Sequence, residues 1–182
     1  MRIISGTLRG RRLKAPDWDG LRPTSDKLRE TLFNIIGTRI QGARFVDGYA
    51  GTGAVGIEAL SRGAAHVTFV EQDRRAAALV EANLEHCGVE ERYAIIRVDF
   101  ARMRPTEGEA PDVVFVDPPY GAANLASALT AAAAVAASGT QVIAEHARRD
   151  QPPARVGPLV LRRQVTSGDS ALAFYGREGA SE

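Results

Sequence analysis

The sequence predicts an α/β protein with a doubly wound, mostly parallel sheet of seven strands. From about residue 44 onward, short apolar segments alternate with segments of helical periodicity, which is typical of a parallel sheet covered by helices on both faces. A glycine-rich loop follows the first of these apolar segments, as expected where a strand leads into a helix. The turn Ser167-Gly168-Asp169 joins the last two apolar segments, so an antiparallel hairpin must complete the sheet.

The first residues of the chain lie outside this alternation and predict a small β-hairpin. Residues 2–8 and 10–14 are two short segments that flank a glycine-containing turn. We therefore divide the chain into a basic hairpin extension over residues 1–22 and an α/β domain over residues 23–182. The length of 182 residues is enough for one domain with a full core.

The first helix is expected directly after the hairpin extension. Thr24 or Ser25 can cap it, Asp26 lies in its first turn, and Gly37 ends it. Later helices are expected at residues 55–62, 74–87 and 125–137, and strands at 44–47, 66–71, 93–99, 113–117, 141–145, 159–165 and 170–175.

The composition is that of an ordinary globular protein, with 45% hydrophobic residues. No apolar stretch reaches the length of a membrane span, and the first residues lack the apolar region of a signal peptide. The single cysteine, Cys87, excludes an internal disulfide and a cysteine-rich metal site, and we interpret it as a packed thiol. We therefore expect a cytoplasmic protein with no membrane association and no bound metal, and nothing in the sequence requires more than a monomer.

Charge is distributed unevenly along the chain. Residues 1–39 contain nine Lys or Arg and four Asp or Glu, a net charge of +5, and the remaining residues contain fourteen and eighteen, a net charge of −4. Five basic residues and no acidic one lie in the first fourteen positions: Arg2, Arg9, Arg11, Arg12 and Lys14. Such a cluster predicts contact with a polyanion, with an ordinary solvated surface as the alternative.

The glycine-rich loop over residues 47–56 is a candidate nucleotide site. Glycine allows the backbone to approach a ligand closely, and ligands of doubly wound sheets bind beyond the carboxyl ends of the strands. Gly51, Gly53 and Gly56 fit the pattern G-x-G-x-x-G without being a clean example, and the Walker lysine is absent, so ATP hydrolysis is not expected. Glu71 lies eighteen residues after Gly53, where a carboxylate can accept both hydroxyls of a ribose, as it also does in NAD enzymes.

Four successive strands are expected to end in an acidic residue: Asp47, Glu71, Asp99 and Asp117. Because the carboxyl ends of parallel strands meet at one edge of a sheet, these side chains would line one rim. A hydride-transfer site has little use for so many carboxylates. They suit a cationic cofactor that carries a ribose, an adenine amine and an amino-acid ammonium group, and S-adenosylmethionine has all of these.

The tetrapeptide Asp117-Pro118-Pro119-Tyr120 is the most informative motif of the chain. The apolar run of residues 113–116 delivers the carboxylate of Asp117 to the end of a strand, and the two prolines stiffen the turn that follows. Asp117 and the Pro118 carbonyl could accept the N–H bonds of a planar amine while Tyr120 stacks on its face. A Pro-Pro turn that merely closes a strand is the alternative.

These motifs together resemble the class I S-adenosylmethionine-dependent methyltransferases, whose fold is Rossmann-like. More closely, they resemble the RsmD family of bacterial small-subunit rRNA guanine-N2 methyltransferases. The matching segments span almost the whole chain: residues 2–6, 8–13, 21–24, 29–34, 47–53, 56–64, 116–120 and 168–175. The N-terminal segments are specific to that family, whereas DNA amino-methyltransferases share the tetrapeptide. The chain departs from the family at Tyr49, where Phe is more usual, and in the short, alanine-rich loop after Tyr120.

The resemblance implies the residues of the site, with S-adenosylmethionine as the cofactor. The methionine part would be held by Asp47, Gly51, Thr52 and Gly53, the ribose by Glu71, and the adenine by Asp99 and Phe100. The target base would be held by Asp117, which would also border the cofactor, and by Pro118 and Tyr120. The RNA would be contacted by Arg9, Arg11, Arg12, Lys14 and Arg22.

The same resemblance implies methyl transfer to the exocyclic N2 amine of a guanine in 16S rRNA, namely guanine 966. The partner would be rRNA or an assembly intermediate of the small ribosomal subunit. A DNA amino-methyltransferase that acts on adenine N6 or cytosine N4 is an alternative, but such enzymes usually carry a separate recognition domain, for which 182 residues leave no room. The third hypothesis is a non-catalytic RNA-binding assembly factor, which would not need an intact tetrapeptide and glycine loop.

The histidines and the single tryptophan belong to no motif. His66, His86 and His146 are widely spaced and show no metal-ligand pattern, and of the three only His146, at the end of the fifth strand, is placed to face the site. Trp18 lies in a loop rich in Pro, Asp and Gly, and we expect it to pack against the N-terminal hairpin.

Overall fold

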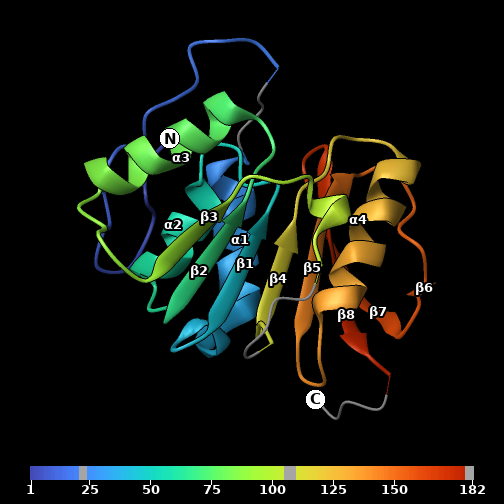
Figure 1. The fold of residues 1–182 in the computed structure, drawn as a ribbon. Coiled ribbons are helices and arrows are strands. Elements are labelled where there is room, and N and C mark those ends of the chain that lie inside the picture. Colours follow the sequence, from blue (N-terminus) through green and yellow to red (C-terminus); the bar gives the residue numbers. More distant parts are fainter. Residues whose placement is uncertain (21–23, 105–109, 179–182) are drawn as a thin grey trace.

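An eight-stranded sheet forms the centre of the structure, with the strand order β3-β2-β1-β4-β5-β8-β7-β6 (Figure 1). The structure is a computed structural model, and it describes residues 1–20, 24–104 and 110–178. The parallel strands are β1 Arg44–Gly48, β2 His66–Val70, β3 Tyr93–Ile96, β4 Val113–Val116 and β5 Gln141–Ala147. The antiparallel strands are β6 Arg155–Val156, β7 Leu159–Ser167 and β8 Ser170–Arg177.

This sheet confirms the predicted Rossmann-like fold and corrects its strand count from seven to eight. The final hairpin enters the sheet as expected, because β8 pairs antiparallel with both β5 and β7. The additional strand, β6, has only two residues and comes just after Pro152 and Pro153. It is too short to show the alternating apolar pattern by which a strand is recognised in a sequence.

Helices cover both faces of the sheet, as the alternation of the sequence predicts. They are α1 Asp26–Ile36, α2 Ala54–Ser61, α3 Arg74–His86 and α4 Ala122–Val135, with short 3-10 helices η1 Gly37–Ile40 and η2 Phe100–Arg102. Side chains of α1, α2 and α3 pack with Val113 and Phe115 of β4, whereas α4 packs with Val114 and Val116. Successive side chains of a strand point to opposite faces, so β4 contributes to both apolar cores.

The first helix begins and ends where the sequence predicts. The Ser25 hydroxyl accepts a hydrogen bond from the Leu28 amide at 3.1 Å, and so satisfies one of the free N–H groups of the first turn. Gly37 follows the last residue with a φ of 58°, a conformation that favours glycine. Ser25 rather than Thr24 is therefore the cap.

The N-terminal segment, residues 1–14, doubles back as predicted but forms only one β-bridge, between Arg2 and Arg12. The amide of Ile3 donates to the Arg11 carbonyl at 2.9 Å, and Ile3 joins the core beneath α1 and α2. The predicted boundary between the hairpin extension and the α/β domain lies at residues 22–23, outside the described residues, so this division remains a prediction.

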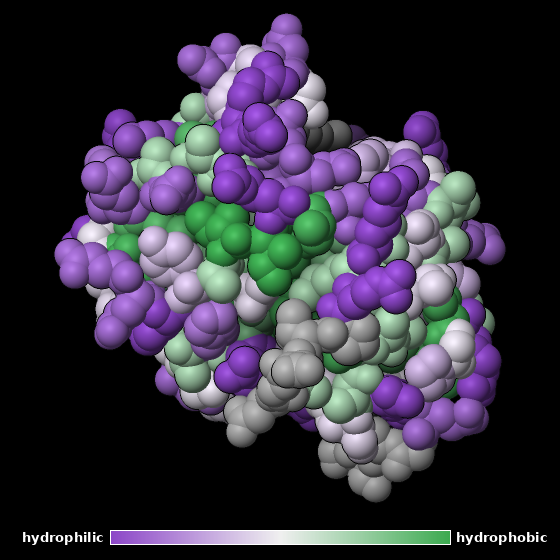
Figure 2. All heavy atoms as spheres, viewed as in Figure 1, coloured by the Kyte–Doolittle hydropathy of each residue, from purple (hydrophilic) through white to green (hydrophobic). Residues whose placement is uncertain are grey.

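Hydrophilic side chains cover most of the face shown in Figure 2, and a band of hydrophobic residues crosses its centre. The most exposed large apolar side chains are Val98 and Tyr120, at 39% and 41%. Within residues 1–20, 24–104 and 110–178, no helix is both long enough and apolar enough to cross a membrane.

Candidate active site

A pocket of about 720 Å³ lies at the carboxyl ends of β1, β2, β4 and β5. Its walls come from the loops that follow these strands, from residues 18–20 of the N-terminal part, and from the β7–β8 turn at residues 167–170. Figure 1 shows this end of the sheet between the blue N-terminal segment and the red β7–β8 turn. This is the place where a doubly wound fold binds its ligand, and the volume suits a molecule of nucleoside size.

The glycine-rich loop forms one wall of the pocket and is fixed by two carboxylates. Asp47, in β1, accepts a hydrogen bond from the Gly56 amide at 2.8 Å and so ties the strand to the first turn of α2. Glu71, directly after β2, accepts from the Gly51 amide at 2.9 Å and from the Asp73 amide at 2.8 Å. Glu71 therefore shapes the glycine loop in addition to lining the pocket.

Glycine is required in this loop for conformation and for packing. Gly51 and Gly53 have φ values of 58° and 77°, which other residues rarely adopt. A side chain at Gly56 would collide with the ring of Phe69 in β2. The loop can therefore approach a ligand closely while α2 packs directly on the sheet.

The pocket is strongly acidic. Its lining contains seven carboxylates, from Asp19, Asp47, Glu71, Asp73, Asp117, Glu145 and Asp169, and two cationic side chains, from Lys27 and Arg75. Burial raises the pKa of Asp47 to about 8, with a further increase from the charge of Glu71, while the hydrogen bond from Gly56 partly opposes the shift. A cation in the pocket would relieve this cost and return Asp47 to its ionised form.

This donor set fits S-adenosylmethionine. The cofactor carries a sulfonium and an ammonium group, which the carboxylates of Asp47 and its neighbours can compensate. Glu71 lies at the end of β2, where a carboxylate can accept ribose hydroxyls. Thr52 lines the same wall. Gly53 is not among the lining residues and directly precedes α2.

Asp117 comes directly after β4, beside the strand that leads into the glycine loop, and its amide donates to the Gly48 carbonyl at 3.3 Å. Its Oδ2 accepts a hydrogen bond from the Thr24 hydroxyl at 3.5 Å, and its carboxyl also hydrogen-bonds to that of Glu145 in β5. Burial, the charge of Glu145 and the charge of Asp47 together raise the pKa of Asp117 well above its ordinary value. Glu145 is a site residue that the motifs did not single out, although the sequence placed it at the end of a strand.

The rest of the tetrapeptide forms a fixed turn with an exposed ring. Asn124 donates to the Pro119 carbonyl at 3.0 Å, and the Tyr120 hydroxyl lies 3.0 Å from the hydroxyl of Ser170 in β8. Pro118 and Tyr120 line the pocket together with Asp117, and Tyr120 is 41% exposed. The ring is therefore available to stack on a planar group at the mouth of the pocket.

Asp99 does not end β3 as the sequence indicates, and neither Asp99 nor Phe100 is among the residues that line the pocket, so their contact with adenine remains a prediction. Asp99 lies three residues beyond the end of β3 and caps η2, with its carboxylate accepting from the Ala101 amide at 3.0 Å. Phe100 is buried, and its ring lies 5.6 Å from that of Tyr49. Tyr49 lines the pocket, and Phe100 packs against the ring of Tyr49.

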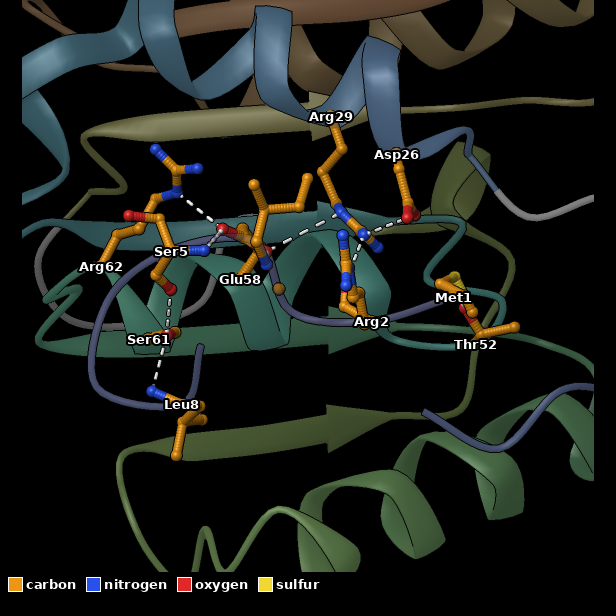
Figure 3. A network of polar contacts seen from close by, with 12 residues as sticks. Met1, Arg2, Ser5, Leu8, Asp26, Arg29, Thr52, Glu58, Ser61 and Arg62 are labelled. Carbon is orange, nitrogen blue, oxygen red and sulfur yellow. Dashed lines mark hydrogen bonds and ion pairs between the residues drawn. The ribbon is translucent and has the colours of Figure 1, made fainter. Parts of the chain in front are cut away.

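A buried ionic network fixes the N-terminal segment on α2 (Figure 3). Glu58 accepts hydrogen bonds from the amides of Ile4 at 2.8 Å and Ser5 at 2.9 Å, and from Arg62 at 2.7 Å. Arg29 donates to the Arg2 carbonyl at 2.6 Å. Glu58 and Arg29 are fully buried, and the signal that could have revealed Glu58 is a lone acidic residue in the apolar helix Ala54–Ser61.

The predicted RNA-binding residues lie on the outside of this anchored segment. Arg9, Arg12 and Lys14 are exposed, whereas Arg11 donates to the Cys87 carbonyl at 2.7 Å and so also has a structural contact. Arg22 lies outside the described residues. Cys87 itself is buried, as predicted, and burial raises the pKa of its thiol.

Asn83, a buried residue of α3, joins this segment to the glycine loop. Its Oδ1 accepts from the Lys14 amide at 2.7 Å, and its Nδ2 donates to the carbonyls of Lys14 at 3.2 Å and Thr52 at 2.9 Å. One side chain therefore fixes both the basic segment and a wall of the pocket. No sequence motif marks it.

The structure corrects the expectation for Trp18 and decides against the lesser alternative for His146. Trp18 does not simply pack against the hairpin: it lines the pocket, and the Arg75 guanidinium lies 5.1 Å from the centre of its ring. His146 does not line the pocket, because it is the neighbour of Glu145 on β5 and faces the other way, where its Nδ1 lies 2.9 Å from the Ala147 carbonyl oxygen.

Comparison with known proteins identifies the family. The model of the family described as Conserved hypothetical protein 95, which is the RsmD family, matches residues 1–176. The chain belongs to the RsmD family of methyltransferases. The ribosomal RNA small subunit methyltransferase D of Escherichia coli (strain K12) is 34% identical over 184 residues, covering 100% of this chain and 92% of that protein.

Other RsmD-family relatives give the same result. YlbH of Bacillus subtilis, named as a candidate rRNA methyltransferase, is 37% identical over 184 residues, covering 98% of this chain and all of that protein. Among solved structures, the candidate methyltransferase yhhF of Escherichia coli has a TM-score of 0.84 with 34% identity, covering 100% of this chain and 99% of that chain. The resemblance seen in the sequence is thus confirmed.

Proposed function

We propose that this protein transfers a methyl group from S-adenosylmethionine to the exocyclic N2 amine of a guanine in 16S rRNA, by family resemblance guanine 966. The substrate is rRNA itself or an assembly intermediate of the small subunit, and the protein acts in the cytoplasm as a monomer. The observation that carries the proposal is that Asp117 and Tyr120 of the tetrapeptide line the same acidic pocket as the glycine loop. The rRNA methyltransferase names of two relatives, from Bacillus subtilis and Escherichia coli, support rRNA as the substrate.

When bound, S-adenosylmethionine supplies an electrophilic methyl group on a positively charged sulfur. The residues of the chain position the nucleophile. Asp117 and the Pro118 carbonyl accept the two amine protons, which raises electron density on the nitrogen as the new bond forms. Alignment of the amine with the methyl group contributes further, because well-oriented reactants can gain roughly 7–11 kcal/mol.

The target base must leave its stack to enter the pocket. Tyr120, exposed at the mouth, offsets part of the stacking energy by packing on the extruded base. Arg9, Arg12 and Lys14 lie on the N-terminal segment whose continuation, at residues 18–20, borders the pocket. They are placed to contact the phosphates that flank the base.

The test is a map of modified nucleosides in small-subunit rRNA from cells with and without this protein, followed by addition of purified protein and labelled S-adenosylmethionine. We expect one N2-methylguanosine to disappear and to be restored by the wild type but not by Asp117→Ala. An unchanged rRNA profile with methyl transfer to DNA would instead favour an amino-methyltransferase of DNA. RNA binding without any methyl transfer would favour an assembly factor.

A further inference from the structure

Two carboxyl groups lie side by side in the pocket, and the proposed function uses only one of them. Asp117 follows β4 and Glu145 lies in β5, and the register that pairs Val116 with Ala144 places the two acidic residues next to each other. Glu145 is 5% exposed, and both residues line the pocket. Their carboxyls are joined by a hydrogen bond.

A hydrogen bond between two carboxyl groups requires a proton on one of them. Two hydrogen-bonded, buried carboxyls cannot both be fully ionised, so the pair retains one shared proton. The surroundings strengthen this effect, because burial, Glu145 and Asp47 all raise the pKa of Asp117. The pair therefore has one ionised carboxylate and one retained proton when a substrate arrives.

We infer that Glu145 is a positioning residue for methyl transfer, which retains the shared proton and keeps Asp117 as the acceptor for the substrate amine. This inference rests on the proposed function, because it assigns the path of a proton that methylation of an amine must release. Asp117 is half-buried and would contact the amine, whereas Glu145, in β5, is buried. Glu145 acts through Asp117.

Atoms and charge balance in this step. The lone pair of the amine nitrogen forms the N–C bond, and the electron pair of the breaking S–C bond stays on sulfur. The nitrogen then carries one excess proton, which moves along its hydrogen bond to the ionised oxygen of Asp117. Glu145 still holds the shared proton, so both carboxyls are neutral until the product leaves and one proton passes to water.

Other charged and titratable groups face this pair from every wall of the pocket. The wall of β1 and β2 contributes Asp47, Tyr49, Glu71, Asp73 and Arg75, and the N-terminal part contributes Asp19. Lys27 comes from α1, and the other side contributes Tyr120 and Asp169. Asp47 acts on Asp117 in the same sense as Glu145. A comparison of single variants is needed to separate the two effects.

The decisive experiment is the pH dependence of kcat for rRNA methylation by wild type, Glu145→Gln, Glu145→Asp and the control Glu178→Gln. Glu178 is an exposed carboxylate that pairs with Arg155, remote from the pocket lining. Glutamine has no proton to lose, so the second titration of the pair, in which the shared proton leaves and both carboxyls become ionised, is absent from Glu145→Gln. We expect the alkaline limb of the wild-type profile, which reports this loss, to be missing in Glu145→Gln.

Glu145→Asp keeps a carboxyl and should retain most of the wild-type alkaline limb, and Glu178→Gln should retain all of it. A lower plateau with an unchanged alkaline limb in Glu145→Gln would overturn the inference, because poorer packing lowers the rate without changing which proton is titrated.

Unfolding of the ligand-free protein provides a readout independent of catalysis. A carboxyl whose pKa is raised in the folded state makes stability fall as pH rises from the usual carboxyl range toward the raised pKa. Denaturation of Glu145→Gln should show a shallower fall than the wild type as pH rises above the usual carboxyl range, and parallel curves would overturn the inference. If the wild type fails to methylate rRNA, the proposed function fails, and this comparison still tests the pair.

Discussion

The side chain of Asn83 holds the backbone of Lys14 at both ends, accepting from its amide at 2.7 Å and donating to its carbonyl at 3.2 Å. The same Nδ2 donates to the Thr52 carbonyl at 2.9 Å, so a single buried amide connects the basic segment with the glycine loop. Replacement of Asn83 by Ala would leave these backbone groups without their partner inside the protein.

We expect Asn83→Ala to lower the free energy of unfolding by about 1–3 kcal/mol, the usual cost of unsatisfied buried polar groups. Cofactor affinity should also fall, because Thr52 lines the pocket. Denaturant unfolding and calorimetric titration measure the two effects. Asn34→Ala, on the exposed side of α1, is the control and should change stability by less than about 0.5 kcal/mol.

Cofactor binding should depend on pH through Asp47. Its pKa of about 8 in the ligand-free protein means that the carboxyl is largely protonated at neutral pH. A cationic ligand favours the ionised form, so binding releases a proton, and affinity should increase with pH by up to about tenfold per unit until it levels near pH 8. Calorimetry in buffers of different ionisation enthalpy counts this proton, and Asp47→Asn should reduce the count.

The same group affects the stability of the ligand-free protein in the opposite direction. In the unfolded chain Asp47 loses its proton above its ordinary pKa of 3.8, whereas in the folded state it keeps this proton up to about pH 8. The free energy of unfolding should therefore fall as pH rises from 3.8 to about 8 and should then stay constant. Asp47→Asn should be less sensitive to pH over this window. A wild-type stability that rises steadily across it would contradict the assignment.

Asp117→Ala should lose most methyl transfer, by roughly 10² to 10⁴ in kcat, because the amine loses its principal acceptor. Cofactor affinity should survive in part, since the glycine loop and Glu71 do not depend on Asp117. Single-turnover assays with a saturating cofactor, together with a binding titration, separate the two. Full turnover by the folded variant would rule out this role for Asp117.

Breaking the network beneath the N-terminal segment should be costly. Glu58 is fully buried and pairs with Arg62 at 2.7 Å, so Glu58→Ala should destabilise the protein by about 3–5 kcal/mol. The exposed pair of Arg155 and Glu178, with a separation of 2.6 Å, is the matched control, and Glu178→Ala should destabilise the protein far less, because solvent screens an exposed pair. Equal destabilisation of the two variants would show that burial of Glu58 has no energetic consequence.

RNA affinity should depend on the exposed basic residues of the N-terminal segment. Arg12→Gln or Lys14→Gln should weaken binding at low salt and reduce the slope of log affinity against log salt by about 0.7–0.9 for each phosphate that is no longer neutralised. Arg39→Gln, an exposed arginine at the opposite end of the sheet, should leave the slope unchanged. Arg11→Gln should in addition lower stability, because Arg11 also bonds the Cys87 carbonyl.

The fold could be predicted largely from local pattern. The alternation of apolar and amphipathic segments gives the strands and helices, and the cap at Ser25 and the stop at Gly37 are visible in the chain. β6 could not be predicted, because pairing with β7 rather than any property of Arg155 and Val156 defines it.

Site residues that follow strands or form motifs were accessible to the same reasoning, whereas those defined by long-range contacts were not. Asp47, Glu71 and Asp117 end strands and meet in one pocket, but Asp99 is carried past β3 to cap η2. Glu145 belongs to the site because it hydrogen-bonds to Asp117, which follows a different strand. Asn83 belongs to it because its side chain hydrogen-bonds to two segments that are distant in the sequence. Such partners become visible only when the topology brings them together.

Trp18 gives the protein a built-in optical reporter. It is the only tryptophan of the chain, it lines the pocket, and its ring lies next to the guanidinium of Arg75. Indole emission responds to contact with charged groups and to exclusion of water, so ligand entry should alter the fluorescence of this single ring. Occupancy of the pocket can then be followed in real time on the unlabelled, unmodified protein.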